Sequence, residues 1–451
     1  MPIKLTVIGG GSSSFVPALV RKLINSDLLN DVHLTLMDIN EQRVRTMEEL
    51  ARKLVASSGS SLQVTATLDR RESLRDADYV ITTIAAGGMN AWEKDIEIPA
   101  KYGIVMHVAD SIGPGGIMRA LRNAPVIAAV AREVAEVAPD ALVFNYANPA
   151  SVGAMALRTV PEVKSLSLCS CTAQPSHSGW LGHYVGVEPD EIEMPVVVAG
   201  INHCASVIEL RLKDGRDGLA LARERVDEPV VKWALETYGV LPYCWQHWVE
   251  FHPQMQYADE PYNGRAQGLR VRYGIKTHDM DYERGRVKQF EDLAVAWTQP
   301  DAGTVTLEDL PPGDEDEGIE VIQIMEAIVD NRNETHIVNA LNGGTIPNLP
   351  SDAIVEVNAS VNAYGVRPIY TGPLPEPLAA HLRQYVALQK QMVKAALSGD
   401  RRDALHAFLL EPTIAARLDL TQTEAMLDEL LVAHAEYLPN FAGRTARSAA
   451  P

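Results

Sequence analysis

The stretch VIGGGSSSFVP (residues 7–17) constrains the fold more than any other part of the chain. Its three consecutive glycines stand between a strand-like apolar run, KLTVIGG (4–10), and a segment with helical periodicity. In that segment the apolar residues at helical spacing are Val16, Leu19, Val20 and Leu23. A second strand-like run, VHLTLMD (32–38), follows, so the sequence predicts a strand, a tight turn, a helix and a parallel strand.

The same alternation continues along the first part of the chain. Strand-like runs recur at 77–86 and 141–149, and a long helical pattern covers 117–138. This predicts an α/β fold in which residues 1–200 form a Rossmann-type, doubly wound parallel sheet with helices on both faces. From about residue 201 the segments are richer in aromatic, His and Pro residues, so we expect a second, mixed α+β domain over 201–445 for substrate, metal and oligomer contacts.

Composition excludes several classes of partner. The net charge of −19, without a long Lys/Arg run, disfavours a nucleic-acid partner. The sequence contains no run of eighteen apolar residues, the length that a membrane span needs. The N-terminus enters a strand pattern directly, so we expect a cytoplasmic protein. Four cysteines are too few and too clustered for a disulfide framework, so we expect reduced thiols, with metal or catalytic use open.

The glycine turn predicts a dinucleotide site. Gly9, Gly10 and Gly11 would let backbone N–H groups approach a pyrophosphate at the helix N-terminus. Asp38 ends the second strand, where a carboxylate binds a ribose and repels a 2′-phosphate, which favours NAD over NADP. Ser14 replaces the usual third glycine of the motif, and such turns also occur in α/β proteins without a dinucleotide. The remaining residues assigned to this cofactor site are Ser12, Ser13 and Arg43.

Seven stretches, in order, carry a family resemblance. They are VIGGGSSSFVP (7–17), DIEIPAKYGI (95–104), DSIGPGGIMRALRNAPV (110–126), NYANP (145–149), SLCS (167–170), GINHC (200–204) and HIVNALNGGTIPNLPSDAIVEV (336–357). With these the sequence resembles the NAD-dependent family 4 glycoside hydrolases along most of its length. The resemblance is closest to the branch that acts on uronides, and the chain is also similar to the related NAD-dependent sulfoquinovosidases.

The resemblance implies a redox route to hydrolysis. NAD⁺ oxidises the sugar at C3, the ketone acidifies the C2 proton, a base removes it, and the C1 group is eliminated. Water then adds and the steps reverse, so the cofactor emerges unchanged. A divalent ion, Mn²⁺ by resemblance, would stabilise the enediolate-like intermediate as a Lewis acid.

Cys169 and His203 match the metal-ligand positions of the family, and each follows a strand-like run. A thiolate and an imidazole suit a divalent transition ion, and His203 would also lie against the substrate. The chain departs from the family next to this cysteine, where relatives usually have His, Asp or Asn and this sequence has Ser170 and then Cys171.

Asn148, in NYANP, matches a family position that contacts the hydroxyls at C2 and C3, although an Asn before Pro also forms turns. Asp110 matches an acidic family position near the substrate and is assigned a catalytic role, with loop capping as the alternative. The C2 base is tyrosine in relatives. The candidates here are Tyr243, Tyr273, Tyr282 and, beyond tyrosine, His247.

The stretch LPYCWQHWVEFHP (241–253) indicates a changed substrate pocket. It keeps His247, but Trp245 and Gln246 replace the polar Asp and Arg of uronide-acting relatives, and Trp92 stands where many relatives carry Arg. Indole and amide N–H groups can bind the three oxygens of a sulfonate, although a single aromatic residue is more often part of the core.

The sequence therefore predicts a glycosidase, homo-oligomeric by family, that uses NAD⁺ and a divalent ion. Its substrate would be a small α-glycoside with an anionic group at C6. A sulfoquinovoside is favoured, and a glucuronide or galacturonide is the first alternative. The other hypotheses are an NAD-dependent hydroxy-acid dehydrogenase, which would lack the Cys169 and His203 pair, and a non-enzymatic NAD sensor.

Overall fold

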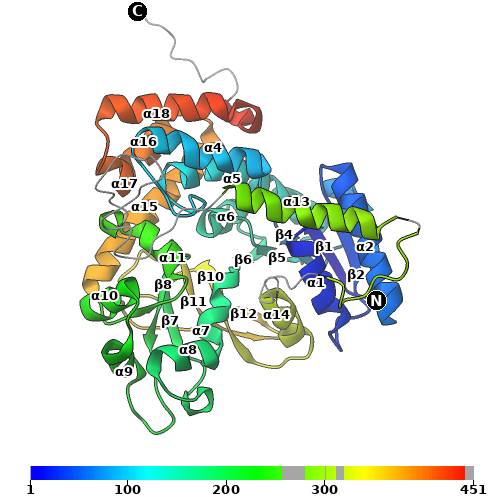
Figure 1. The fold of residues 1–451 in the computed structure, drawn as a ribbon, viewed down its shortest axis with the longest axis horizontal. Coiled ribbons are helices and arrows are strands. Elements are labelled where there is room, and N and C mark those ends of the chain that lie inside the picture. Colours follow the sequence, from blue (N-terminus) through cyan, green and yellow to red (C-terminus); the bar gives the residue numbers. More distant parts are fainter. Residues whose placement is uncertain (1, 256–279, 300, 311–318, 442–451) are drawn as a thin grey trace, which may run out of the picture.

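The computed structural model describes residues 2–255, 280–299, 301–310 and 319–441. Its strands join in one twelve-stranded sheet in the order β3-β2-β1-β4-β5-β6-β10-β11-β7-β8-β9, with β12 paired to β11 (Figure 1). The strands are β1 (Lys4–Ile8), β2 (His33–Met37), β3 (Gln63–Thr67), β4 (Tyr79–Thr82), β5 (Leu142–Asn145), β6 (Lys164–Ser167), β7 (Val197–Ile201), β8 (Cys204–Glu209), β9 (Leu241–Pro242), β10 (Glu334–Leu341), β11 (Ile354–Asn362) and β12 (Gly365–Pro368).

The first six strands confirm the predicted doubly wound sheet. They pair in parallel in the order β3-β2-β1-β4-β5-β6, which is the strand order of dinucleotide-binding folds. Side chains alternate between two cores, because neighbouring residues of a strand point to opposite faces. Tyr79 and Ile81 of β4 are buried with α1, whereas Val80 between them is buried against α5. Helices therefore cover both faces, as predicted.

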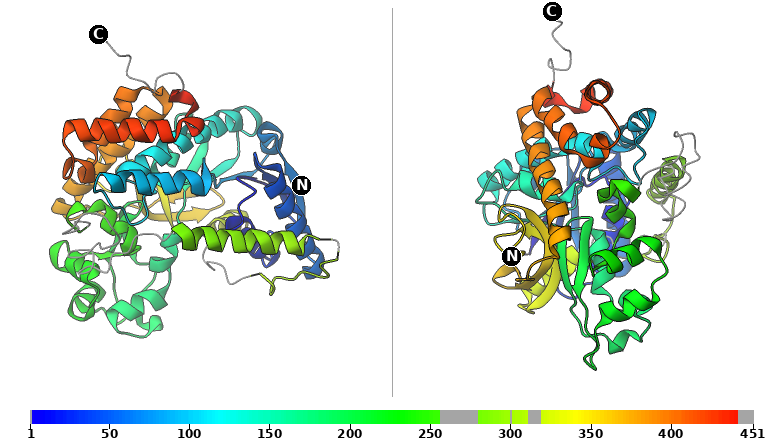
Figure 2. Two further views of the ribbon diagram at one scale, coloured as in Figure 1. Left: turned by 45° about the horizontal axis from the view of Figure 1, so that its top comes forward. Right: turned by 90° about the vertical axis from the view of Figure 1, so that its left-hand side faces the viewer.

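The longer helices form two layers (Figure 2). On one face α4 (Gly88–Lys101), α5 (Gly113–Val137), α6 (Ala150–Leu157), α15 (Glu376–Ser398), α16 (Arg401–Leu410) and α18 (Leu420–Ala433) pack together. On the other lie α1 (Phe15–Ile24), α2 (Glu41–Ser58) and α14 (Ile319–Val329), with α13 (Met280–Trp297) against α2. Among the helices of the described ranges, none is long and apolar enough to cross a bilayer.

The second half of the chain extends the same sheet with antiparallel strands. β10 joins the edge strand β6, and β11, β7, β8 and β9 follow. α8 (Ser178–Val185), α9 (Gly218–Arg225) and α10 (Pro229–Thr237) pack around β7 and β8. The short elements are α3 (Arg70–Leu74), α7 (Ala173–Ser176), α11 (Trp245–Trp248), α17 (Pro412–Ala415), η1 (Ser170–Thr172), η2 (Pro189–Glu191), η3 (Val249–Phe251), η4 (Pro253–Met255), η5 (Ala435–Tyr437) and η6 (Pro439–Phe441). The expected boundary at residue 200 falls inside β7, so the two predicted halves share one sheet.

Candidate active site

The glycine turn after β1 leaves no room for side chains. Gly9 has φ +101°, and a Cβ there would lie 2.7 Å from the Thr83 carbonyl oxygen. A Cβ on Gly10 would lie 2.8 Å from the Cβ of Leu36. The Gly11 N–H donates to Asp38 Oδ2 at 2.9 Å. The turn therefore packs directly against the end of β2 and brings the predicted glycines and Asp38 together.

The other residues predicted for the cofactor lie at or near this turn. Ser12 Oγ accepts a hydrogen bond from the Phe15 N–H at 3.2 Å at the start of α1, and Ser13 is the next residue of the turn. Arg43, in the first turn of α2, pairs with Glu291 of α13 at 2.6 Å. The Arg43 side chain is 53% exposed, so its charge lies at the surface beside the turn.

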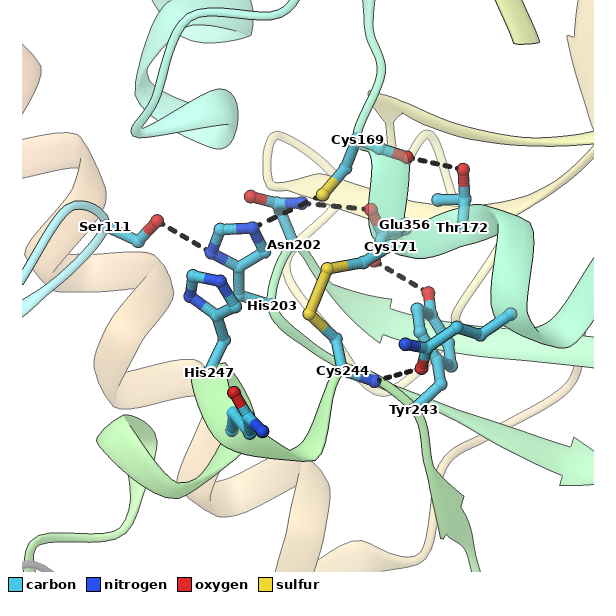
Figure 3. The surroundings of a disulfide bond; sticks show 12 residues. Ser111, Cys169, Cys171, Thr172, Asn202, His203, Tyr243, Cys244, His247 and Glu356 are labelled. Atoms are coloured by element: carbon cyan, nitrogen blue, oxygen red, sulfur yellow. Dashed lines mark hydrogen bonds between the residues drawn. A yellow bond between two sulfur atoms is a disulfide. The ribbon is translucent and has the colours of Figure 1, made fainter. Parts of the chain in front are cut away.

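Cys169 and His203 meet beyond the carboxyl end of β6. Cys169 Sγ lies 3.3 Å from His203 Nε2, and both side chains are buried. On the opposite side of the imidazole, Nδ1 lies 2.8 Å from Ser111 Oγ (Figure 3). The Ser111 hydroxyl donates to Asp110 Oδ1 at 2.8 Å, so its oxygen accepts from Nδ1–H. The Nε2 lone pair is therefore free to face the thiol, which is the tautomer that a metal-binding histidine needs.

Burial disfavours charge on both members of this pair. Burial, with a contribution from Glu356, raises the pKa of the Cys169 thiol above its ordinary value. Burial lowers the pKa of His203, which keeps the imidazole neutral. A buried thiol becomes a thiolate most readily when a metal ion takes up the charge. The donor set of Cys169 and His203 therefore fits a divalent ion.

Further ligand atoms lie close to this pair. Asp110, His203 and His247 bring one ligand atom each within 4.8 Å of one another. The imidazoles of His203 and His247 stack with ring centroids 3.9 Å apart, and His247 Nδ1 lies 3.9 Å from Asp110 Oδ1. Burial acts against the charge of Asp110, but His247 and His203 outweigh it and hold the pKa of this carboxyl below its usual range.

Asn148 is bonded into the same site. Its Nδ2 donates to Asp110 Oδ2 at 2.6 Å, and its carbonyl accepts from Asn123 Nδ2 of α5 at 2.8 Å. Asn148 follows β5, so it reaches the same edge of the sheet as the glycine turn after β1. The structure thus brings together Asp110, Asn148, Cys169, His203 and His247, which the sequence analysis names as candidates.

Two buried carboxylates that the sequence analysis missed hold these residues. Glu356 of β11 accepts from Asn202 and Asn339, and its Oε2 accepts from the Tyr243 hydroxyl at 2.7 Å. Glu250 accepts from the Val108 and Ala109 N–H groups at 2.7 and 3.0 Å, which fixes the loop that carries Asp110. Glu356 lies in the late family stretch and Glu250 in the 241–253 stretch, but the sequence alone assigns neither a role.

Of four further candidate residues, the structure argues against the predicted role of two, leaves one exposed at the surface and does not describe the last. Tyr243 is buried and donates to Glu356, and burial with this carboxylate raises its pKa well above the ordinary value, which disfavours it as the C2 base. The Trp92 indole N–H donates to the Val108 carbonyl at 2.7 Å, so this donor does not face a sulfonate. Tyr282 is 66% exposed at the start of α13, and Tyr273 lies outside the described residues.

Trp245 and Gln246 lie in α11 beside His247. Trp245 packs partly against two apolar cores, and Gln246 Oε1 lies 3.3 Å from His107 Nε2. The Gln246 contact places this residue next to the Asp110 loop, since His107 belongs to the segment that Glu250 holds.

The expectation of four reduced thiols is wrong. Cys171 and Cys244 form a disulfide, while Cys169 and Cys204 are free (Figure 3). The partners are 73 residues apart in the sequence, and folding brings the segment after Cys169 against the start of α11. The number and clustering of the cysteines did not predict this bond, because they indicate frameworks of several bridges and not a single bridge between distant segments.

Comparisons with known proteins match both halves of the chain to one family. The family model described as "Family 4 glycosyl hydrolase" matches residues 4–175, and "Family 4 glycosyl hydrolase C-terminal domain" matches 198–414. An α-galactosidase of Bacillus subtilis is 30% identical over 97% of this chain and 99% of its own length. An α-galacturonidase of the same organism is 26% identical over 95% of this chain and 97% of its own.

A solved structure has the same fold. It is a 6-phospho-α-glucosidase from gut microorganisms in complex with NAD and Mn²⁺, with a TM-score of 0.77, 22% identity and coverage of 97% of this chain and 99% of that chain. Both family models together span most of the chain, which favours a glycosidase over a hydroxy-acid dehydrogenase. The chain belongs to family 4 of the glycosyl hydrolases and is an enzyme that hydrolyses glycosidic bonds.

Proposed function

We propose that this enzyme hydrolyses an α-glycoside with an anionic group at C6, using NAD⁺ and Mn²⁺, with a sulfoquinovoside as the favoured substrate and a uronide as the alternative. The observation that carries the proposal is the position of Cys169 and His203. This metal-ligand pair lies at the same edge of the sheet as the glycine turn, because Cys169 follows the parallel strand β6 and Gly9 follows β1. A sugar between them can contact a nicotinamide and a metal ion together.

The residues present fit both groups. The glycine turn would hold the pyrophosphate of NAD⁺ against the N-terminus of α1, with Asp38 beside the adenosine ribose. Cys169 and His203 would hold the ion, with Asp110 or His247 near enough to complete its ligand set. When bound, NAD⁺ supplies transient oxidation of the sugar and the ion supplies Lewis-acid stabilisation of negative charge on the sugar oxygens.

The protein's own residues would orient the sugar and move its protons. Asn148 and Asp110 are hydrogen-bonded to one another, so they present fixed polar atoms to the hydroxyls at C2 and C3. His247 is the described candidate for moving a proton, because its imidazole lies beside both Asp110 and His203. Tyr243 would act through Glu356 by holding the carboxylate that bonds Asn202, the neighbour of His203.

Two of the similar proteins act, by their names, on anionic sugars. A galacturonide carries a carboxylate at C6, and one relative is an α-galacturonidase. A 6-phosphoglucoside carries a phosphate there, and a structural neighbour is a 6-phospho-α-glucosidase. The uncharged donors of Trp245 and Gln246 suit a sulfonate, which is weakly basic and permanently charged. We also propose that the enzyme acts in the cytoplasm as a homo-oligomer.

A panel of p-nitrophenyl glycosides tests this proposal. The α-sulfoquinovoside, α-glucuronide, α-galacturonide and α-glucoside are incubated with enzyme dialysed against chelator, with NAD⁺ and Mn²⁺ each added or withheld. We expect cleavage of one anionic glycoside that requires both additions. Faster cleavage of the α-glucoside would refute the substrate class, and accumulation of NADH with a hydroxy acid in the absence of glycoside cleavage would refute the glycosidase.

A further inference from the structure

Two arginines of α5, three positions apart, differ in their partners. Arg122 forms a bidentate ion pair with Asp95, with N–O distances of 2.8 and 2.6 Å. Arg119 forms no ion pair with any carboxylate of the described residues, and its Nε is buried without a hydrogen-bond partner there. A direct ion pair compensates the charge of Arg122, whereas the Asp110 and Asp95 charges act on Arg119 from beyond ion-pair distance, so the two arginines are in different electrostatic situations.

The Arg119 guanidinium faces the candidate site. Arg119 and Asn123 lie four positions apart on α5 and so share a helix face, and Asn123 bonds Asn148. Asn148 in turn donates to Asp110 Oδ2 at 2.6 Å, so this face of α5 meets the segment that carries Asp110.

A rigid aromatic surface holds this guanidinium. Its Cζ lies 6.0 Å from the centre of the Trp92 ring, a distance at which a cation is attracted to the ring face. The Trp92 indole is itself fixed by its hydrogen bond to the Val108 carbonyl, in the loop that Glu250 holds. Stacking on the ring leaves the guanidinium edge, with its fork of N–H donors, available for a planar or tetrahedral anion.

We propose that Arg119 binds the anionic group of the sugar and selects charged over neutral glycosides. This inference rests on the proposed function, to which it adds the positive charge that Trp245 and Gln246 lack. Carboxylate, sulfonate and phosphate all accept the paired N–H bonds of a guanidinium, so the shared chemistry is an oxyanion attached at C6.

The experiment measures binding, so that it does not depend on turnover. Sulfoquinovose, galacturonic acid, glucose 6-phosphate and glucose are titrated by calorimetry into the NAD⁺- and Mn²⁺-loaded enzyme. The variants are Arg119→Gln, Arg119→Lys and, as matched control, Arg132→Gln, which changes an exposed arginine of the same helix. NAD⁺ affinity is measured alongside to verify that each variant is folded.

We expect Arg119→Gln to weaken binding of the preferred anionic sugar by roughly ten- to a hundredfold while glucose changes about twofold or less, since hydrogen bonds to charged groups are the stronger class. Arg119→Lys keeps the charge but not the paired N–H donors, so its affinity for the anionic sugar should fall between those of wild type and Arg119→Gln. It also provides the test if Arg119→Gln does not fold. Arg132→Gln should match wild type.

Two other outcomes are distinguishable. If wild type prefers an anionic sugar and Arg119→Gln keeps that preference, or weakens glucose equally, Arg119 supports Asp110 and the inference is wrong. If wild type itself binds glucose as tightly as every anionic sugar, the proposed substrate class is wrong.

Discussion

Cys169 and His203 are 34 residues apart in the sequence, yet their Sγ and Nε2 atoms lie 3.3 Å apart. The opposite ring nitrogen of His203 is held by Ser111, whose hydroxyl is held in turn by Asp110. These two hydrogen bonds fix both the orientation of the imidazole and the nitrogen that carries its proton. The candidate metal-ligand pair is therefore assembled by tertiary contacts from three separate segments.

Replacing Ser111 tests the hydrogen bonds that join His203 to Asp110. Ser111→Ala removes the acceptor for His203 Nδ1–H and frees the ring to rotate, so Mn²⁺ affinity should fall by roughly 10- to 100-fold. Mn²⁺ titration followed by electron paramagnetic resonance measures it. Cys169→Ala should lose binding, and Ser170→Ala, an exposed serine beside the ligand, should keep it. Unchanged affinity in Ser111→Ala would show that the serine does not position His203.

Replacing Gly10 tests the cofactor turn. In Gly10→Ala the new Cβ would meet Leu36 and Met37 atoms at 2.8 Å, so the turn must shift away from β2. We expect NAD⁺ affinity to fall by roughly tenfold or more, because a small displacement of a binding group has a large effect. Calorimetric titration with NAD⁺ provides the measurement. The control is Gly285→Ala, at an exposed position of α13 with nothing near its new Cβ, and it should bind NAD⁺ as wild type does. Equal NAD⁺ affinities in wild type and both variants would show that the glycine turn does not bind the cofactor.

The disulfide predicts a redox-dependent stability. Reducing Cys171–Cys244 opens a loop of 73 residues, so the free energy of unfolding should drop by about 2–4 kcal/mol. Urea unfolding with and without a dithiol reductant measures the difference. The double variant Cys171→Ser with Cys244→Ser is the control, and the reductant should leave its stability unchanged. Wild type that behaves like this variant, with four free thiols by mass spectrometry, would contradict the bridge.

Glu250 predicts a fall in stability with rising pH. Burial, assisted by Asp110, raises its pKa from 4.5 to about 8 in the folded protein. Between these values the folded protein keeps a proton that the unfolded chain has released, so the free energy of unfolding decreases as pH rises through this window. Glu250→Gln keeps an acceptor for the Val108 and Ala109 N–H groups but does not titrate, so its stability should vary less with pH.

Urea unfolding at a series of pH values from 4.5 to 8 compares the three proteins, with Glu236→Gln, at an exposed position of α10, as the control. The control should follow the wild-type profile. A Glu250→Gln profile parallel to that of wild type would show that Glu250 is ionised across this range in the folded protein.

Local signals in the sequence predicted the elements and the residues at their ends. The apolar runs at 4–10 and 32–38 became β1 and β2, and the glycines and Asp38 met because parallel strands end at one edge. Contacts between distant segments had no such signal. The bridge between Cys171 and Cys244 and the bond from Trp92 to Val108 depend on how loops approach in the fold.

The hydrogen bonds of Glu356 are a second example of contacts that the sequence does not predict. A lone glutamate in an apolar strand gives no indication that it will accept bonds from Asn202, Asn339 and Tyr243. Tyr243 is accordingly a candidate base by family resemblance and by its place in the second predicted domain, and only its buried bond to Glu356 shows why its proton is firmly held.

The central claim is that hydrolysis proceeds through oxidation and removal of the C2 proton. Hydrolysis of the preferred glycoside in D₂O, with NAD⁺ and Mn²⁺ present, tests it directly by mass spectrometry and NMR of the released sugar. The account predicts deuterium at C2, no net NADH, and no hydrolysis without NAD⁺. Release of sugar with its original C2 hydrogen, at the same rate with and without NAD⁺, would contradict it.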